Sequence, residues 1–216
     1  MTLKYANAAP KVSGANVVAA YTENAANATV LANAVVPADY TGGTMSKATV
    51  KVDQGFSKGD VLAVGTSVAG ISASFESTTG VLTLSGSAST ADYQTALRSV
   101  NFSSSSDDPT ASATSRSIHW QVYDSAGVAS KNDAGSTTTL NITAVNNAPT
   151  LTNLPVSGDV KYTEGSGAVR VASSVTLSDA DDHLFSQVQV TLGGTGLVAA
   201  KEFLGIEGQT PGTGSM

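Results

Sequence analysis

Residues 79–100 read TGVLTLSGSASTADYQTALRSV and combine two different patterns of apolar residues. Apolar and polar residues alternate from Gly80 to Ser85, with the period of two that half-buried strands show. From Thr90 to Arg98 the apolar spacing becomes that of a helix, for which Thr90 is the predicted N-terminal cap. The stretch therefore predicts a strand followed by one short helix. The apolar residues that share one face of this helix are Tyr93, Ala96 and Leu97.

The strand-like alternation also occurs on both sides of this stretch. It covers residues 48–52, 118–123 and 137–145, and clusters of glycine, serine and asparagine separate these segments. Hydrophobic residues make up 41% of the chain but aromatic residues only 6%, so the core is expected to consist of small and β-branched side chains. Many short strands with turn signals between them predict an all-β fold, an antiparallel β-sandwich.

An internal repeat divides the chain. Asn147-Ala148-Pro149 repeats Asn7-Ala8-Ala9-Pro10, and Tyr162-Thr163-Glu164 repeats Tyr21-Thr22-Glu23, at a spacing of about 140 residues. Residues 188–192 align loosely with residues 48–52 at the same spacing. This predicts an N-terminal linker over residues 1–8, a complete repeat over 9–146 and a partial second repeat over 147–216. Because half a sandwich leaves strand edges unpaired, we expect the natural protein to continue beyond this chain.

Charge and composition exclude several classes of partner. The chain of 216 residues has a net charge of −6 and no basic cluster, whereas binding to nucleic acid needs lysine and arginine to neutralise phosphates. No apolar run approaches the roughly 18 residues of a transmembrane helix, so membrane insertion is not expected. The absence of cysteine removes disulfides, thiolate zinc sites and cysteine nucleophiles. An acidic chain of this kind is better suited to binding cations.

Several motifs together resemble the cadherin-like tandem repeats of large bacterial surface adhesins, proteins that also carry VCBS-type or RTX-type segments. Besides residues 79–100, the matching stretches are Asp108-Pro109, Arg116, residues 122–127, the linker 145–149 and residues 177–181. The resemblance implies a Greek-key β-sandwich of the cadherin/Ig-like class, with a second, incomplete repeat.

The resemblance also implies a function. The chain would be a calcium-stiffened extracellular spacer or adhesion module, secreted or displayed on the bacterial cell surface, through which the parent protein mediates cell adhesion or biofilm attachment. Its partners would be the neighbouring repeats of the same polypeptide, with cell-surface or matrix carbohydrate as a further partner.

The densest group of oxygen ligands is the acidic stretch Asp179-Ala180-Asp181-Asp182. Calcium takes six to eight oxygen ligands, and carboxylates two residues apart can converge on one ion where the backbone curls. A solvated acidic turn explains the same residues equally well, so the pattern alone leaves both interpretations open.

The resemblance assigns calcium ligands from three segments. In such repeats an ion between domains is held by a glutamate near the end of the first strand, by linker oxygens and by an Asp-x-Asp of the next domain. The residues that match these roles are Glu23, Asn146, Asn147, Asp179 and Asp181. Because Asn146 stands where the family usually has aspartate, we expect a modest affinity.

Other acidic residues are weaker candidates. The outer end of the first repeat offers only Asp39 and Asp124, so we expect little or no calcium binding there. The position of Asp92 at the start of the predicted helix is explained by capping alone.

An enzymatic function is not expected. The chain has two histidines and no Gly-x-Ser-x-Gly motif that could present a nucleophile. His119 lies in a predicted strand, where we expect a satisfied hydrogen bond, and His183 follows the acidic stretch. Asp107-Asp108-Pro109 is expected to be a loop between two strands.

A carbohydrate-binding β-sandwich module is the alternative function, because such modules bind sugars on exposed aromatic faces. Trp120 is the only tryptophan, and the alternation places it on the same strand face as Val122. Since a sandwich needs a large aromatic residue in its core, we expect Trp120 to be buried.

Overall fold

The structure, a computed structural model, describes residues 7–25, 29–32, 35–39, 43–131, 133–155, 160–191 and 204. Within these ranges the regular structure is mostly β-sheet, which confirms the predicted all-β class. The chain divides into two compact units, residues 1–181 and 182–216. The elements named below lie in the first unit.

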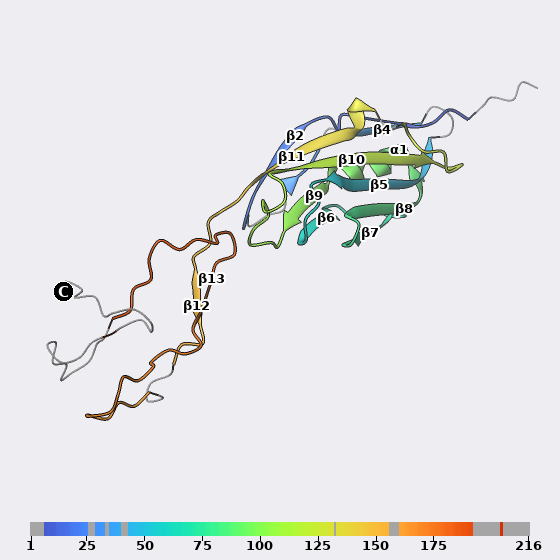
Figure 1. Cartoon of the computed structure of the whole chain (residues 1–216). Coiled ribbons are helices and arrows are strands. Elements are labelled where there is room, and N and C mark those ends of the chain that lie inside the picture. Colours follow the sequence, from blue (N-terminus) through green and yellow to red (C-terminus); the bar gives the residue numbers. More distant parts are fainter. Residues whose placement is uncertain are drawn as a thin grey trace, which may run out of the picture. The chain divides into compact units, whose positions relative to one another are not determined.

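Two sheets carry most of the strands (Figure 1). The six-stranded sheet has the order β2 (Val18–Thr22), β11 (Thr137–Thr143), β10 (Ser115–Asp124), β5 (Thr44–Gln54), β8 (Val81–Ser89) and β7 (Ser72–Glu76). The three-stranded sheet has the order β3 (Thr29–Val30), β9 (Val100–Ser104) and β6 (Asp60–Val64). Two short pairs complete the strands: β1 (Lys11–Ser13) with β4 (Val36–Ala38), and β12 (Thr150–Thr152) with β13 (Thr176–Ser178).

The predicted strands all fall on observed strands of the six-stranded sheet. Residues 48–52 lie within β5, 118–123 within β10, and 80–85 and 137–145 overlap β8 and β11. The pairings within this sheet are antiparallel except that of β2 with β11, which is parallel. The prediction of antiparallel pairing is therefore wrong at this pair. The two strands lie far apart in the sequence, so no hairpin turn constrains their relative direction.

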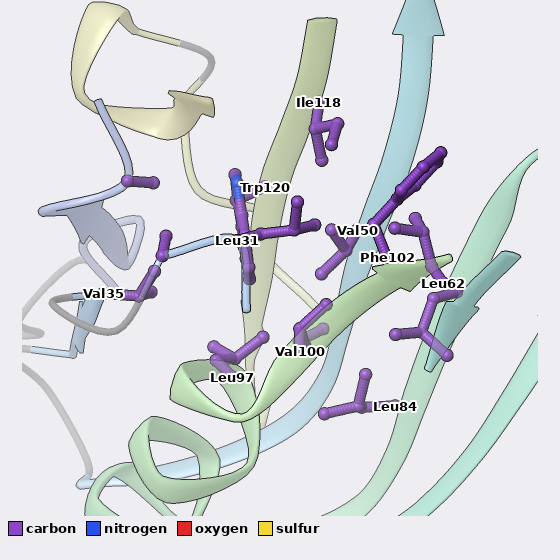
Figure 2. Packing of buried hydrophobic residues seen from close by; sticks show 14 of the residues in the cluster. Leu31, Val35, Val50, Leu62, Leu84, Leu97, Val100, Phe102, Ile118 and Trp120 are labelled. Carbon is purple, nitrogen blue, oxygen red and sulfur yellow. The ribbon is translucent and has the colours of Figure 1, made fainter. Parts of the chain in front are cut away.

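The core lies between the two sheets, and most of its buried side chains come from β5, β8, β9, β10 and β11. Figure 2 shows Trp120 of β10 and Val50 of β5 packed near Phe102 of β9 and Leu97 of the helix. Trp120 is fully buried, as expected, and its Nε1 donates a hydrogen bond to the hydroxyl of Thr138 at 2.9 Å. Burial of one such large side chain stabilises the fold by roughly 1.5–3 kcal/mol.

The helix α1 (Thr90–Arg98) has the predicted bounds, but its cap differs from the prediction. Ser89, not Thr90, is the N-cap: its hydroxyl accepts a hydrogen bond from the amide of Asp92, and the Asp92 carboxylate accepts one from the amide of Ser89. This reciprocal capping box outweighs a lone threonine because it satisfies two backbone donors at once. The predicted inner face of α1 is buried.

The two halves of the sequence repeat have different environments. Tyr21 is 2% exposed, its ring packs edge-on against Phe102 with centroids 5.1 Å apart, and its hydroxyl donates to the carbonyl of Ser104. Tyr162, its counterpart, is 66% exposed. The core hydrophobic residues run from Val12 to Ile142, and the described residues after Ile142 add no buried hydrophobic side chain to them. The predicted boundary at 146/147 thus follows the end of this core, whereas the division into units falls after Asp181.

Candidate functional site

Glu23 lies at the end of β2, where the parallel pairing with β11 holds it. Its backbone amide donates to the carbonyl of Thr143 at 2.9 Å, so the residue continues the register of the pair. Its side chain is only 3% exposed, and Oε2 accepts a hydrogen bond from the amide of Val145 at 2.9 Å. The carboxylate is therefore buried but held by hydrogen-bond donors, the amide of Val145 and the side chains of Asn24 and Asn147, as a buried charge requires.

Asn147 connects Glu23 with two other segments of the chain. Its side-chain Nδ2 donates to Oε1 of Glu23 at 3.1 Å and to the backbone carbonyl of Asp107 at 2.8 Å. Its backbone amide donates to Oδ2 of Asp181 at 2.8 Å. One linker residue thus contacts the end of β2, the loop before β10 and the acidic stretch that follows β13.

The acidic stretch brings two carboxylates together. The amide of Asp181 donates to Oδ1 of Asp179 at 3.2 Å, and Oδ1 of Asp181 is buried with no hydrogen-bond partner. The hydrogen bond from the Asn147 amide lowers the pKa of Asp181, but the neighbouring Asp179 carboxylate and burial outweigh it, so the pKa is raised. A raised pKa means that the ionised form lacks sufficient positive or donor groups around it.

The structure brings together four of the five predicted ligand residues. Glu23, Asn147, Asp179 and Asp181 form one connected hydrogen-bonded cluster, called the linker cluster below. The fifth, Asn146, is exposed, and its Nδ2 donates to the backbone carbonyl of Asn147 at 2.8 Å. In the described part of the chain no hydrogen bond joins it to the three carboxylates. Within the described ranges, no three acidic or histidine side chains stand close enough to form a ready metal centre.

Sequence reasoning missed two groups of the linker cluster, the carbonyl of Asp107 and the amide of Val145. Both are backbone groups, which every residue type carries, so no residue pattern could have identified them. The loop containing Asp107 is nevertheless well anchored. Arg116 donates from Nη2 to the carbonyl of Pro109 and from Nη1 to that of Ala113, each at 2.8 Å.

At the other end of the domain, the carboxylate of Asp124 accepts hydrogen bonds from nearby backbone amides. Its buried carboxylate accepts hydrogen bonds from the amides of Ala126 at 2.9 Å and Val128 at 2.8 Å, and from the side chain of Asn7. Burial raises the pKa of Asp124, but these hydrogen bonds together outweigh burial and lower the pKa overall. Asp39 is half-buried and directly follows β4.

None of the other residues considered from the sequence belongs to the linker cluster. Asp92 belongs to the capping box of α1. Nε2 of His119 is buried without a hydrogen-bond partner, so the expected satisfied hydrogen bond is wrong for this atom. His183 is exposed in the second unit. Trp120 and Tyr93 are fully buried, so neither presents an aromatic face on which a sugar could stack.

Neither protein-family models nor curated proteins match this chain. In the described part of the chain the helices, α1 with nine residues and η1 (Ala134–Ser136) with three, are too short to cross a bilayer.

Proposed function

We propose that the chain is a calcium-stiffened spacer module of an extracellular bacterial repeat protein. In this proposal residues 9–146 form a Greek-key β-sandwich of the cadherin-like class, and the residues that follow begin the next repeat. Adhesion or biofilm attachment belongs to the parent protein, in which such modules separate the adhesive region from the cell. The observation that carries the proposal is that Asn147 bonds at once to Glu23 and to Asp181.

The chemistry of the linker cluster suits calcium. Calcium prefers oxygen ligands, and the cluster offers the carboxylates of Glu23, Asp179 and Asp181. The unpartnered Oδ1 of Asp181 and the raised pKa of that residue both reflect negative charge that lacks a counter-charge. A divalent cation would supply that counter-charge, and the side chains would draw together around it.

Stiffening follows from which segments the cluster joins. Glu23 belongs to the end of the six-stranded sheet, Asn147 to the linker, and Asp181 to the stretch after β13. An ion bound by all three removes conformations that hydrogen bonds alone leave open. A ligand that binds only the folded form stabilises it by about 1.4 kcal/mol at a concentration about ten times its Kd. An amide rather than a carboxylate at Asn146 favours a modest affinity, of the order of 10⁻⁴–10⁻³ M as in other extracellular modules.

Thermal unfolding of the full chain, in millimolar calcium and in chelator, tests the proposal. We expect calcium to raise the unfolding midpoint by several degrees, and magnesium to raise it much less because magnesium keeps its own waters. The double variant Asp179→Ala, Asp181→Ala should lose this rise. A wild-type midpoint that ignores calcium would refute the proposal.

The matched control is the double variant Asp53→Ala, Glu76→Ala, which removes the same charge from exposed residues of β5 and β7. It should keep the full calcium response. An equal loss in both double variants would mean that calcium acts only on the overall charge of the protein. Small-angle X-ray scattering then separates binding from stiffening, since a stiffened linker should give a narrower distribution of maximum dimensions with calcium.

A further inference from the structure

The side-chain amide of Asn147 occupies a site between two oxygen atoms that can only accept. Its Nδ2 lies 3.1 Å from Oε1 of Glu23 and 2.8 Å from the carbonyl oxygen of Asp107. Neither oxygen has a hydrogen to give, so the amide must present its nitrogen and not its oxygen to them. This arrangement places a partial positive charge where two negative groups converge.

Those distances are close to what a cation would need. Calcium binds oxygen at roughly 2.3–2.6 Å, so an ion in place of the nitrogen requires each oxygen to move inward by less than about 1 Å. Carbonyl oxygens are ordinary calcium ligands. The carbonyl of Asp107 is thus positioned to act as a calcium ligand. The exposed side chain of Asp107 gives no indication of this role.

We propose that the Asp107 carbonyl is a calcium ligand and that the Asn147 amide nitrogen holds the place of the ion when calcium is absent. The proposal rests on the calcium-binding function proposed above and extends the site to a fourth segment, the loop between β9 and β10. When calcium enters, the Asn147 amide rotates so that its oxygen, in place of its nitrogen, faces the ion. The site is then assembled from backbone as well as side-chain oxygens.

The loop that carries Asp107 is held in position from the domain interior. Arg116 clamps the carbonyls of Pro109 and Ala113 and is itself paired with Asp60. A loop held at two of its carbonyls has already lost much of its conformational freedom, so recruiting the nearby Asp107 carbonyl to an ion costs little further ordering. This is the physical advantage of a backbone ligand on an anchored loop.

The variant Asn147→Asp tests the placeholder role, with Asn146→Asp as the matched control. A carboxylate at position 147 cannot donate to Glu23 or to the Asp107 carbonyl, so without calcium the unfolding midpoint should fall by about 5 °C. With calcium the added charge becomes favourable, and the Kd should fall on the order of tenfold. Asn146 is exposed and loses only its hydrogen bond to the Asn147 carbonyl, so the same charge there should lower the calcium-free midpoint much less.

Carbon-13 NMR of the wild-type chain tests the ligand role directly. On titration with calcium the carbonyl resonance of Asp107 should shift more than those of Ser106 and Asp108. A calcium response without this selective shift, or equal calcium-free midpoints for the two variants, would overturn the inference while leaving the proposed function standing. Absence of any wild-type calcium response would overturn both.

Discussion

Arg116 and Asp60 form an ion pair in the interior of the domain: Nε of Arg116 lies 2.7 Å from Oδ2 of Asp60, and neither side chain is exposed. A buried charge that loses its partner keeps its full desolvation cost. We therefore expect Asp60→Ala to lower the free energy of unfolding by about 3–5 kcal/mol, measured by urea denaturation. Asp53→Ala is the control, because it breaks the exposed pair with Lys51 and should cost less than about 1 kcal/mol. Equal losses would show that the interior pair contributes no more than a surface pair.

Gly86 of β8 has a backbone conformation and surroundings that exclude a side chain. Its φ is +143°, and a Cβ atom would lie 1.9 Å from the carbonyl oxygen of Gly70. Gly86→Ala should lower the free energy of unfolding by at least about 2 kcal/mol, measured by urea denaturation. In Gly70→Ala the new Cβ would meet nothing nearer than 3.9 Å, so only the positive φ is strained and the loss should be about 1 kcal/mol. A Gly86 variant as stable as the Gly70 variant would contradict the predicted clash.

Because Ser89 forms the capping box, we expect its side chain to stabilise α1 more than that of its neighbour Thr90. Ser89→Ala removes the hydroxyl that accepts from the amide of Asp92 and should lower the unfolding free energy by about 1 kcal/mol. Thr90→Ala removes only an exposed hydrogen bond to the carbonyl of Gly43 and should cost less. Thermal unfolding of the two variants compares them, and the reverse order would restore Thr90 as the cap.

The hydroxyl of Thr138 links Trp120 to the N-terminal segment. It accepts from Nε1 of Trp120 and donates to the carbonyl of Ala15 at 2.6 Å. Thr138→Val keeps the shape but leaves Nε1 of Trp120 without a partner, whereas the carbonyl of Ala15 still accepts from the amide of Val17 at 2.9 Å. The loss of stability should be about 1–3 kcal/mol. Thr139→Val, at an exposed position of the same strand, is the control and should change stability by less than about 0.5 kcal/mol.

The burial of Trp120 also predicts its fluorescence. The emission should be that of an apolar environment, and a panel of soluble sugars should neither quench nor shift it. A saturable change with one sugar would support the carbohydrate-binding alternative after all.

Because of the Asp124 carboxylate, we expect the protein to lose stability in acid. Its folded-state pKa is lowered, because the hydrogen bonds from Val128, Asn7 and Ala126 outweigh burial. A lowered folded pKa contributes stability that is present above the unfolded pKa and is lost as the pH falls through the folded value. The wild type should therefore lose stability below about pH 4, and Asp124→Asn should lose less over the same range. Parallel pH profiles of the two proteins, measured by thermal unfolding, would contradict this assignment.

Local patterns in the sequence predicted the secondary structure well where each segment carries its own signal. The alternation in residues 118–123 placed Trp120 and Val122 on one face, and both are buried. The helical spacing of residues 90–98 identified both the bounds and the inner face of α1. The cap was missed because Ser89 and Thr90 are equally suitable by type, and the difference lies in backbone conformation.

The calcium ligands are predicted from a resemblance rather than from a local pattern. In the structure the five predicted residues have different hydrogen-bond partners. Glu23, Asn147, Asp179 and Asp181 are connected, although Glu23 lies more than a hundred residues before the other three. Asn146 has the same residue type as Asn147 and adjoins it, yet its side chain bonds to the Asn147 carbonyl and, in the described part of the chain, to none of the three carboxylates. Adjacent residues of an extended linker point in different directions, so the residue type could not distinguish them.

The spacing of apolar side chains within a few residues was sufficient to predict four strands (β5, β8, β10 and β11), the helix α1 and the buried faces of β10 and α1. The parallel pairing of β2 with β11, the ion pair of Arg116 with Asp60 and the approach of the Asp107 carbonyl to Asn147 follow from the tertiary structure alone. Each of these depends on segments that are distant in the chain or on backbone groups that every residue shares. Such relationships depend on the packing of the whole domain, which no local sequence pattern specifies.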